Sequence, residues 1–239
     1  MDRARRATLV ILLVIACAMT FDSARPGAVR GPEIVPAADV GWPPSGGLLV
    51  AEIVTGGASA SDEYVEIVNA GSAATDLAGL EVAYVTASGS TVTRKATWSA
   101  SALVEPGRRV LLANASGAFA AAADVTYSGG FAATGGTIVL RAVGGSPIDA
   151  VGWGDATNEF VEGSAAIAPP AGSSIERRPG GSAGNSVDSN VNAADLVINA
   201  APEPRNASAG PLPGPMPSPS PTSAPLPSPV PSPTPTPTV

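Results

Sequence analysis

The middle of the chain consists of short apolar runs that turn-forming residues interrupt, and this pattern limits the possible folds more than any other feature. The first three runs are Leu48 to Val54 before Thr55-Gly56-Gly57, Tyr64 to Val68 before Asn69-Ala70-Gly71-Ser72, and Leu80 to Thr86 before Ser88-Gly89-Ser90. Later runs are Thr91 to Trp98, Arg109 to Ala113, Thr137 to Ala142 and Ile148 to Trp153. Short strands at roughly ten-residue spacing, without a long segment of 3.6-residue period, predict an all-β protein.

Side chains alternate within these runs in the way that a two-faced strand requires. Val65 and Ile67 share one face of their strand, whereas Tyr64, Glu66 and Val68 share the other. We therefore expect an antiparallel β-sandwich in which two sheets pack face to face. The Ala-rich segment 119–123 is compatible with a helical turn.

Composition divides the chain into four parts. Residues 47–206, about 160 residues, are enough for one domain with its own core. Residues 25–46 are rich in Pro and Gly, which break helices and strands, so we expect a linker there. Residues 207–239 are dominated by Pro, Ser and Thr, and we expect a disordered, extended spacer that crosses a wall layer or leads to a further part of a longer protein.

The N-terminal residues 1–24 have the layout of an export signal. Arg3, Arg5 and Arg6 precede fifteen residues, 7–21, that carry no charge. The apolar run is short for a membrane-spanning helix, so we expect a cleaved signal peptide, with an uncleaved signal anchor as the alternative. Residues 16–18, Ala-Cys-Ala, suit ordinary signal peptidase, but residues 14–17, Val-Ile-Ala-Cys, resemble a bacterial lipobox in which Cys17 is lipidated. In each case the folded part is expected outside the cell or on its surface, with a membrane tether if Cys17 is acylated.

Composition also excludes several classes of protein. The chain has no His and one Cys, which removes the usual zinc ligands, Ser-His-Asp triads and Cys-His nucleophile pairs, and any intrachain disulfide. Twenty acidic residues against thirteen basic ones give a net charge of −7. Since nucleic acid is itself strongly negative, we expect no nucleic-acid partner.

The order of the segments resembles that of the lamin-tail domain family as found in exported bacterial proteins. The segments that carry the resemblance are Leu49 to Val54, Ser61 to Asn69, Thr75 to Leu80, Leu103 to Gly107, Gly136 to Leu140, Ile148 to Gly154, Gly172 to Arg177, and Asp188 to Leu196 with an end near Asn206. The resemblance implies an immunoglobulin-like sandwich without catalytic residues, used as an interaction or accessory module. No heptad rod is present, so the filament role of nuclear lamins does not follow.

Several acidic residues in the strands could carry chemistry. Asp62, Glu63 and Glu66 crowd the second run, and paired carboxylates are the machinery of glycoside hydrolysis. We expect instead that they face solvent or accept hydrogen bonds from backbone N–H groups, and we assign no catalytic residue. Glu52 lies among apolar residues, so it needs a partner if it points inward, with Arg177 or Arg109 as candidates.

One segment has the spacing of a cation-binding loop. Asp188, Asn190, Asn192 and Asp195 place oxygen-bearing side chains at intervals that resemble the first half of a calcium loop. Ala193 stands where such a loop needs Gly, and Asn199 stands where it needs the closing acid. We therefore expect these residues to shape turns, keep calcium as the weaker alternative, and expect no cofactor.

These observations predict a non-enzymatic, exported surface protein. Its partner would be a protein, a glycan or a component of the cell envelope, held by exposed loops such as residues 115–136 and 154–172. The alternative is an accessory module of a secreted hydrolase whose catalytic domain is absent from this chain. Trp98 and Trp153 lie at strand ends, so we expect them to belong to the edge of the apolar core. The less favoured alternative is a sugar-binding face formed by Trp42, Trp98 and Trp153.

Overall fold

A computed structural model of the chain describes residue 45 and residues 47–212. The predicted export signal with Cys17, nearly all of the 25–46 linker with Trp42, and residues 213–239 of the spacer lie outside the described residues. Expectations about those segments therefore stay predictions. Within the described range, no helix combines the length and the apolar character that crossing a bilayer would require.

The predicted strands are present at nearly the predicted positions, and shorter elements that the sequence did not predict lie between them and after the last of them. The strands are β1 (Leu48–Thr55), β2 (Glu63–Asn69), β3 (Thr75–Asp76), β4 (Leu80–Thr86), β5 (Val92–Thr97), β6 (Leu103–Val104), β7 (Arg109–Asn114), β8 (Val125–Tyr127), β9 (Gly135–Ala142), β10 (Pro147–Gly154), β11 (Ser174–Arg177) and β12 (Leu196–Asn199). Helical segments are the 3-10 turns η1 (Ala120–Ala122) and η2 (Gly181–Ala183) and the short α1 (Asn192–Asp195). The Ala-rich segment 119–123, which is compatible with a helical turn, contains η1.

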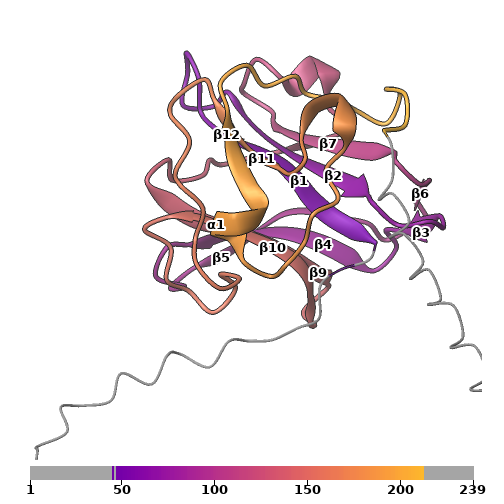
Figure 1. The fold of residues 1–239 in the computed structure, drawn as a ribbon, viewed down its shortest axis with the longest axis horizontal. Coiled ribbons are helices and arrows are strands. Elements are labelled where there is room, and N and C mark those ends of the chain that lie inside the picture. The colour runs from indigo at the N-terminus through magenta and orange to yellow at the C-terminus, as the bar shows by residue number, and fades with distance from the viewer. Residues whose placement is uncertain (1–44, 46, 213–239) are drawn as a thin grey trace, which may run out of the picture. The chain divides into compact units, whose positions relative to one another are not determined.

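Two sheets pack face to face and confirm the predicted immunoglobulin-like all-β sandwich (Figure 1). A six-stranded sheet has the order β12-β11-β1-β2-β7-β8, and a four-stranded sheet has the order β10-β9-β4-β5. β3 and β6 form a separate two-stranded ribbon. β1 bulges between Val50 and Glu52, so the side-chain alternation shifts there, and Glu52 stands opposite Glu66 on β2 and Glu176 on β11.

One strand pair departs from the predicted antiparallel arrangement. β8 runs parallel to β7, with Leu112 opposite Val125. A parallel neighbour needs a crossover and not a hairpin, and residues 115–124 with η1 provide it. The sequence contains no periodic signal for such a connection.

The apolar core lies between the two sheets and ends in an aromatic cluster. Trp153 is fully buried and stacks against Tyr84, and Phe131 packs between them and Tyr127. The indole N–H of Trp153 donates to the carbonyl of Ala132 at 3.1 Å. Trp98 is partly buried against the same core. The two tryptophans within the described range thus belong to the core, as expected, and do not form a sugar-binding face.

The outer face of the six-stranded sheet is covered by chain and not left to solvent. Phe119 and Ala123 of the crossover pack on Tyr64 and Leu111. The C-terminal part of the described chain then crosses the same face, where the N–H of Ala207 donates to Asp124 at 2.9 Å. Residues 207–212, which the sequence placed in the spacer, therefore contact the sandwich.

The end of this covering segment requires a glycine beneath it. The N–H of Leu212 donates to the carbonyl of Gly107 at 3.0 Å. Gly107 has a φ of 73°, and a Cβ at this position would collide with the carbonyl oxygen of Leu212. This close approach holds the last described residues on the domain.

Candidate functional site

Asp62, Glu63 and Glu66 accept hydrogen bonds from backbone N–H groups, which is one of the two expected arrangements, and Glu63 and Glu66 are buried instead of facing solvent. Asp62 accepts from Ser59 at 2.7 Å and from Ala118 at 2.9 Å. The amides of these two residues hold the pKa of Asp62 below its usual value, that of Ala118 first. Asp62 thus anchors the start of the crossover.

Glu63 performs a similar task at the aromatic end of the core. It accepts from the N–H of Phe131 at 2.6 Å and from the side chain of Asn114 at 3.0 Å. The Lys95 ammonium lies 5.0 Å above the ring of Tyr127 and donates to the carbonyl of Gly129 at 3.0 Å. Together these groups fix the 128–131 turn at the end of the sandwich, while most residues of the predicted binding loop 115–136 stay exposed.

Glu52 is buried, but its predicted arginine partners are wrong. Arg177 pairs with Asp149, and Arg109 pairs with Glu66 at 2.8 Å. Glu52 instead accepts hydrogen bonds from the hydroxyl of Ser174 and the amide of Asn199. Burial raises the pKa of Glu52 despite these bonds. The bulge in β1 turns Glu52 to the outer face of the sheet, whereas Arg177 reaches Asp149 on the other sheet.

The residues of the candidate calcium loop form turns and hold neighbouring segments. Asp195 accepts from the N–H and the hydroxyl of Ser189, each at 2.7 Å. Asn192 is fully buried, and its side-chain oxygen Oδ1 accepts from the N–H of Gly152 at 2.9 Å. Asn190 has a φ of 57°, the left-handed conformation that Asn tolerates in turns. The side chains of Asn192 and Asp195 thus bind protein groups within the fold, and so does that of Asp188, which accepts from the N–H of Ser45 at 2.6 Å.

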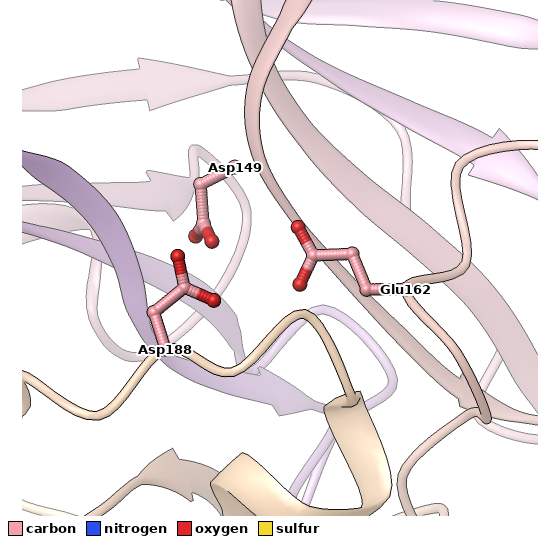
Figure 2. A group of neighbouring side chains, drawn as sticks. All are labelled: Asp149, Glu162 and Asp188. Carbon is pink, nitrogen blue, oxygen red and sulfur yellow. The ribbon is translucent and has the colours of Figure 1, made fainter. Parts of the chain in front are cut away.

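Asp188, the fourth candidate, joins a different group of acids. The carboxylates of Asp149, Glu162 and Asp188 point toward one another (Figure 2). One oxygen of each lies within 4.8 Å of the others, which is close enough for a shared cation. Sequence reasoning missed Asp149 and Glu162, because β10 and the following loop bring them beside Asp188 only in the folded chain. These three acids are the described residues that could hold a metal ion.

A protein cation already faces these acids. The guanidinium of Arg177 donates to both oxygens of Asp149, at 2.8 and 2.9 Å, and lies 3.5 Å from Asp188 and 3.9 Å from Asp195. Burial lowers the pKa of Arg177, but the surrounding carboxylates, Asp149 first, outweigh burial and raise it. Arg177 and the acids Asp149, Glu162, Asp188 and Asp195 form what we call the Arg177 network. The positive charge at the centre of this network is the guanidinium of Arg177 itself.

The Arg177 network joins the two sheets through their backbones. Asp149, on β10, accepts from the N–H of Val50 at 2.6 Å, and Arg177, on β11, donates to the carbonyl of Val50 at 3.0 Å. Val50 precedes the bulge of β1, where the strand ladder leaves these groups without partners. The buried charges therefore complete the hydrogen bonding of an irregular strand.

The edge of β10 is completed in the same way by side chains. Glu162 accepts from the N–H of Ala150 at 3.1 Å, and Asn192 donates to the carbonyl of Ala150 at 2.8 Å. Ala166 then forms a parallel bridge with Trp153. The amide and carboxylate thus replace a neighbouring strand, which blocks this edge against pairing with another chain.

A cavity of about 170 Å³ lies on the outer face of the six-stranded sheet. Its charged and polar lining includes Glu52, Glu66, Glu176, Arg109, Asn199 and Arg205. Burial, and after it the charge of Glu52, raises the pKa of Glu66 to about 8. The η2 loop and the segment after β12 close over this space, which we call the glutamate cavity.

An apolar groove lies beside β12, which forms one edge of the six-stranded sheet. The residues that line the groove are Ala166, Ile167, Ile175, Ala193, Leu196, Val197 and Ile198. Ile167 is 77% exposed and Ile198 is 39% exposed. Ile167 belongs to the predicted binding loop 154–172, so this loop, unlike 115–136, presents a large apolar side chain to solvent.

Comparison with known proteins agrees with this architecture. A family model described as Lamin Tail Domain matches residues 43–155. A search of curated proteins found no match. The matched range spans β1 to β10, and β11 and β12, which follow it, extend the same six-stranded sheet beyond β1.

Proposed function

Since this chain carries a lamin tail domain, we propose that it is a non-catalytic interaction module of an exported bacterial surface protein. Its partner is a protein, a glycan or another component of the cell envelope. The observation that carries the proposal is the apolar groove beside β12, where Ile167 is 77% exposed. Contiguous exposed apolar surface is typical of contact sites, and the two exposed isoleucines adjoin an apolar groove instead of standing singly.

The position of the groove favours a protein segment among the possible partners. Within the described residues β12 pairs on one side only, with β11, so its other backbone edge faces outward. An extended segment can bond to such an edge while its apolar side chains enter the groove. The blocked edge of β10 does not offer this possibility.

The roles of the buried acids support the non-catalytic part of the proposal. Asp149 and Asp195 accept hydrogen bonds from backbone N–H groups and face Arg177. Glu63 and Glu162 likewise accept from backbone N–H groups. Carboxylates in such positions hold the fold together and are not available to a substrate.

Binding to isolated cell envelopes tests the contact surface. The mature protein is incubated with envelope fragments from the source cells, and the bound fraction is measured after sedimentation. Ile167→Asp and Ile198→Asp are expected to lower binding by about ten-fold, the equivalent of about 1.4 kcal/mol. The control is Val92→Asp, because Val92 is 45% exposed on β5 of the other sheet. Equal binding by all three variants and the unaltered protein would refute the groove as the contact surface.

Export is supported by the basic N-terminal residues and the uncharged run that follows them. Mass spectrometry of the protein recovered from cells tests this part. The three export routes give different products. Lipidation leaves an acylated Cys17, cleavage by signal peptidase leaves a chain that begins after Ala18, and an uncleaved anchor leaves an intact chain in the membrane fraction. An intact chain in the cytosol would contradict export.

A further inference from the structure

Three glutamates form a row across neighbouring strands on the outer face of the six-stranded sheet. Glu52 on β1 is in register with Glu66 on β2 and with Glu176 on β11. Neighbouring strands lie about 4.8 Å apart, so the three carboxylates share one surface at the floor of the glutamate cavity. Like charges at this spacing repel one another unless cations or bound protons lie between them, and the charge of Glu52 is, after burial, one reason why the pKa of Glu66 is raised to about 8.

The cations of the cavity compensate only part of this charge. Arg109 pairs with Glu66 at 2.8 Å, and Arg205 pairs with Glu203 at 3.6 Å. Within the described residues, neither Glu52 nor Glu176 forms an ion pair. Glu176 accepts from neutral groups only: the N–H of Gly181 at 2.6 Å and the amides of Asn185 and Asn199.

Arg109, which lines the same cavity, has an N–H group that lacks a hydrogen-bond acceptor within the described part of the chain. Its side chain is 3% exposed; its Nε faces Glu66, and its Nη2 donates to Asn185. Its Nη1 is buried and makes no hydrogen bond to any residue that the structure describes. A buried donor without an acceptor costs about 1–3 kcal/mol, so this N–H group calls for an acceptor from outside the chain.

We infer that the glutamate cavity binds a small zwitterion, whose ammonium group lies between Glu52 and Glu176 and whose carboxylate accepts from Arg109. An ammonium group supplies the positive charge that the two glutamates lack, and a carboxylate supplies the acceptor that Nη1 lacks. A simple amine would leave Nη1 unsatisfied, and a simple acid would add to the negative charge of the row.

The size and position of the cavity fit a molecule of this kind. A volume of about 170 Å³ exceeds the space that one water molecule needs and is smaller than the roughly 300 Å³ at which sites for drug-sized ligands begin. Ala201 and Gly181 are the small residues of the lining, and no aromatic ring is present for a sugar to stack on. These features favour a compact polar ligand over a glycan unit.

Titration by two-dimensional NMR tests the inference on the mature protein. The probes are glycine, β-alanine and γ-aminobutyrate, which vary the distance between the two charged groups, with ethylammonium, acetate and glucose as comparisons. At least one amino acid should shift the amide signals of Gly181 and Ala201 in a saturable way. It should bind about ten-fold more tightly than ethylammonium or acetate, because each of these can satisfy only one end of the site.

Two substitutions complete the test. Glu176 is only partly buried, and Glu176→Gln should weaken binding by about ten-fold, whereas Glu159→Gln, in an exposed loop, should leave it unchanged. The inference is overturned if no amino acid shifts these signals, if glucose alone does so, or if Glu176→Gln binds as the unaltered protein does.

The result is independent of the proposed function. Asn199 of β12 bonds to Glu52 on the cavity side, whereas Ile198 lies opposite Ile175 on the core-facing side. Because successive side chains of a strand point to opposite faces, the cavity and the apolar groove are separate surfaces. Loss of envelope binding in Ile167→Asp therefore says nothing about the zwitterion site, and the reverse also holds.

Discussion

Replacement of Arg177 by methionine should cost the sandwich a large part of its stability. The side chains of Arg177 and Asp149 are both fully buried, and the guanidinium donates to both carboxylate oxygens of Asp149 at 2.8 and 2.9 Å. Methionine fills much of the same volume but leaves Asp149 and the nearby Asp188 without their cation. Breaking a buried ion pair by removing one partner costs about 3–5 kcal/mol, and the orphaned carbonyl of Val50 adds to this loss.

The loss can be measured by equilibrium unfolding in urea at pH 7, followed by tryptophan fluorescence. Arg177→Met is expected to lower the free energy of unfolding by about 3–5 kcal/mol, out of the 5–15 kcal/mol that is usual for a domain. The control is Arg178→Met. Arg178 is the next residue, is exposed, and makes a side-chain bond to the carbonyl of Ala194, so its loss should cost less than about 1 kcal/mol.

A double-mutant cycle shows whether the two buried charges act together. Asp149→Asn alone still leaves Arg177 near Asp188 and Asp195, so its cost should be smaller than that of Arg177→Met. The double variant should lose less than the sum of the single losses, by about 1–3 kcal/mol. A loss below about 1 kcal/mol for Arg177→Met, or a loss equal to that of Arg178→Met, would refute the role of the network.

Three further predictions concern pH, calcium and the core. The pKa of Glu66 is about 8 in the folded chain, above its usual 4.5, so the folded chain binds this proton more tightly than the unfolded chain does. The free energy of unfolding should therefore fall as pH rises from about 4.5 to about 8, by at most about 1.4 kcal/mol per pH unit. Urea titrations at several pH values should show a flatter decline for Glu66→Gln, and an unchanged decline would contradict this assignment. Calcium at about 5 mM, above the Kd of extracellular calcium modules, should leave the melting temperature unchanged, whereas a rise that Asp188→Asn abolishes would establish the calcium alternative. Trp153→Ala should lower the free energy of unfolding by about 3–5 kcal/mol, since the ring is fully buried, and a small loss would show that the core is less tightly packed than described.

The sequence was sufficient to predict the seven longer strands because their information is local, whereas the short strands β3, β6, β8, β11 and β12 were not predicted. Alternation in Val65-Glu66-Ile67 and the turn residues after Val54 define where strands lie and which faces they bury. The burial of Trp153 followed from its place at a strand end, and the backbone bonds of Asp62 followed from its place beside a turn. These features need no knowledge of distant segments.

The polar interior could not be predicted in the same way. Asp149 and Arg177 lie 28 residues apart, and their pairing depends on how β10 and β11 of different sheets approach each other. The bulge in β1 reverses the face on which Glu52 lies, which a strict alternation cannot foresee. Oxygen-bearing residues at 188–195 have the spacing of a cation loop, but several of them serve backbone groups that the fold leaves without partners.

Site-specific photo-crosslinking in living cells tests the central claim most directly, because it asks what touches the groove where the protein works. A photoreactive amino acid is placed at position 167 and, as the control, at position 92 on the other sheet. We predict that position 167 yields an adduct with one discrete envelope component and that position 92 does not. The absence of an adduct at 167, or the same adducts at both positions, would contradict an interaction module that works through this surface.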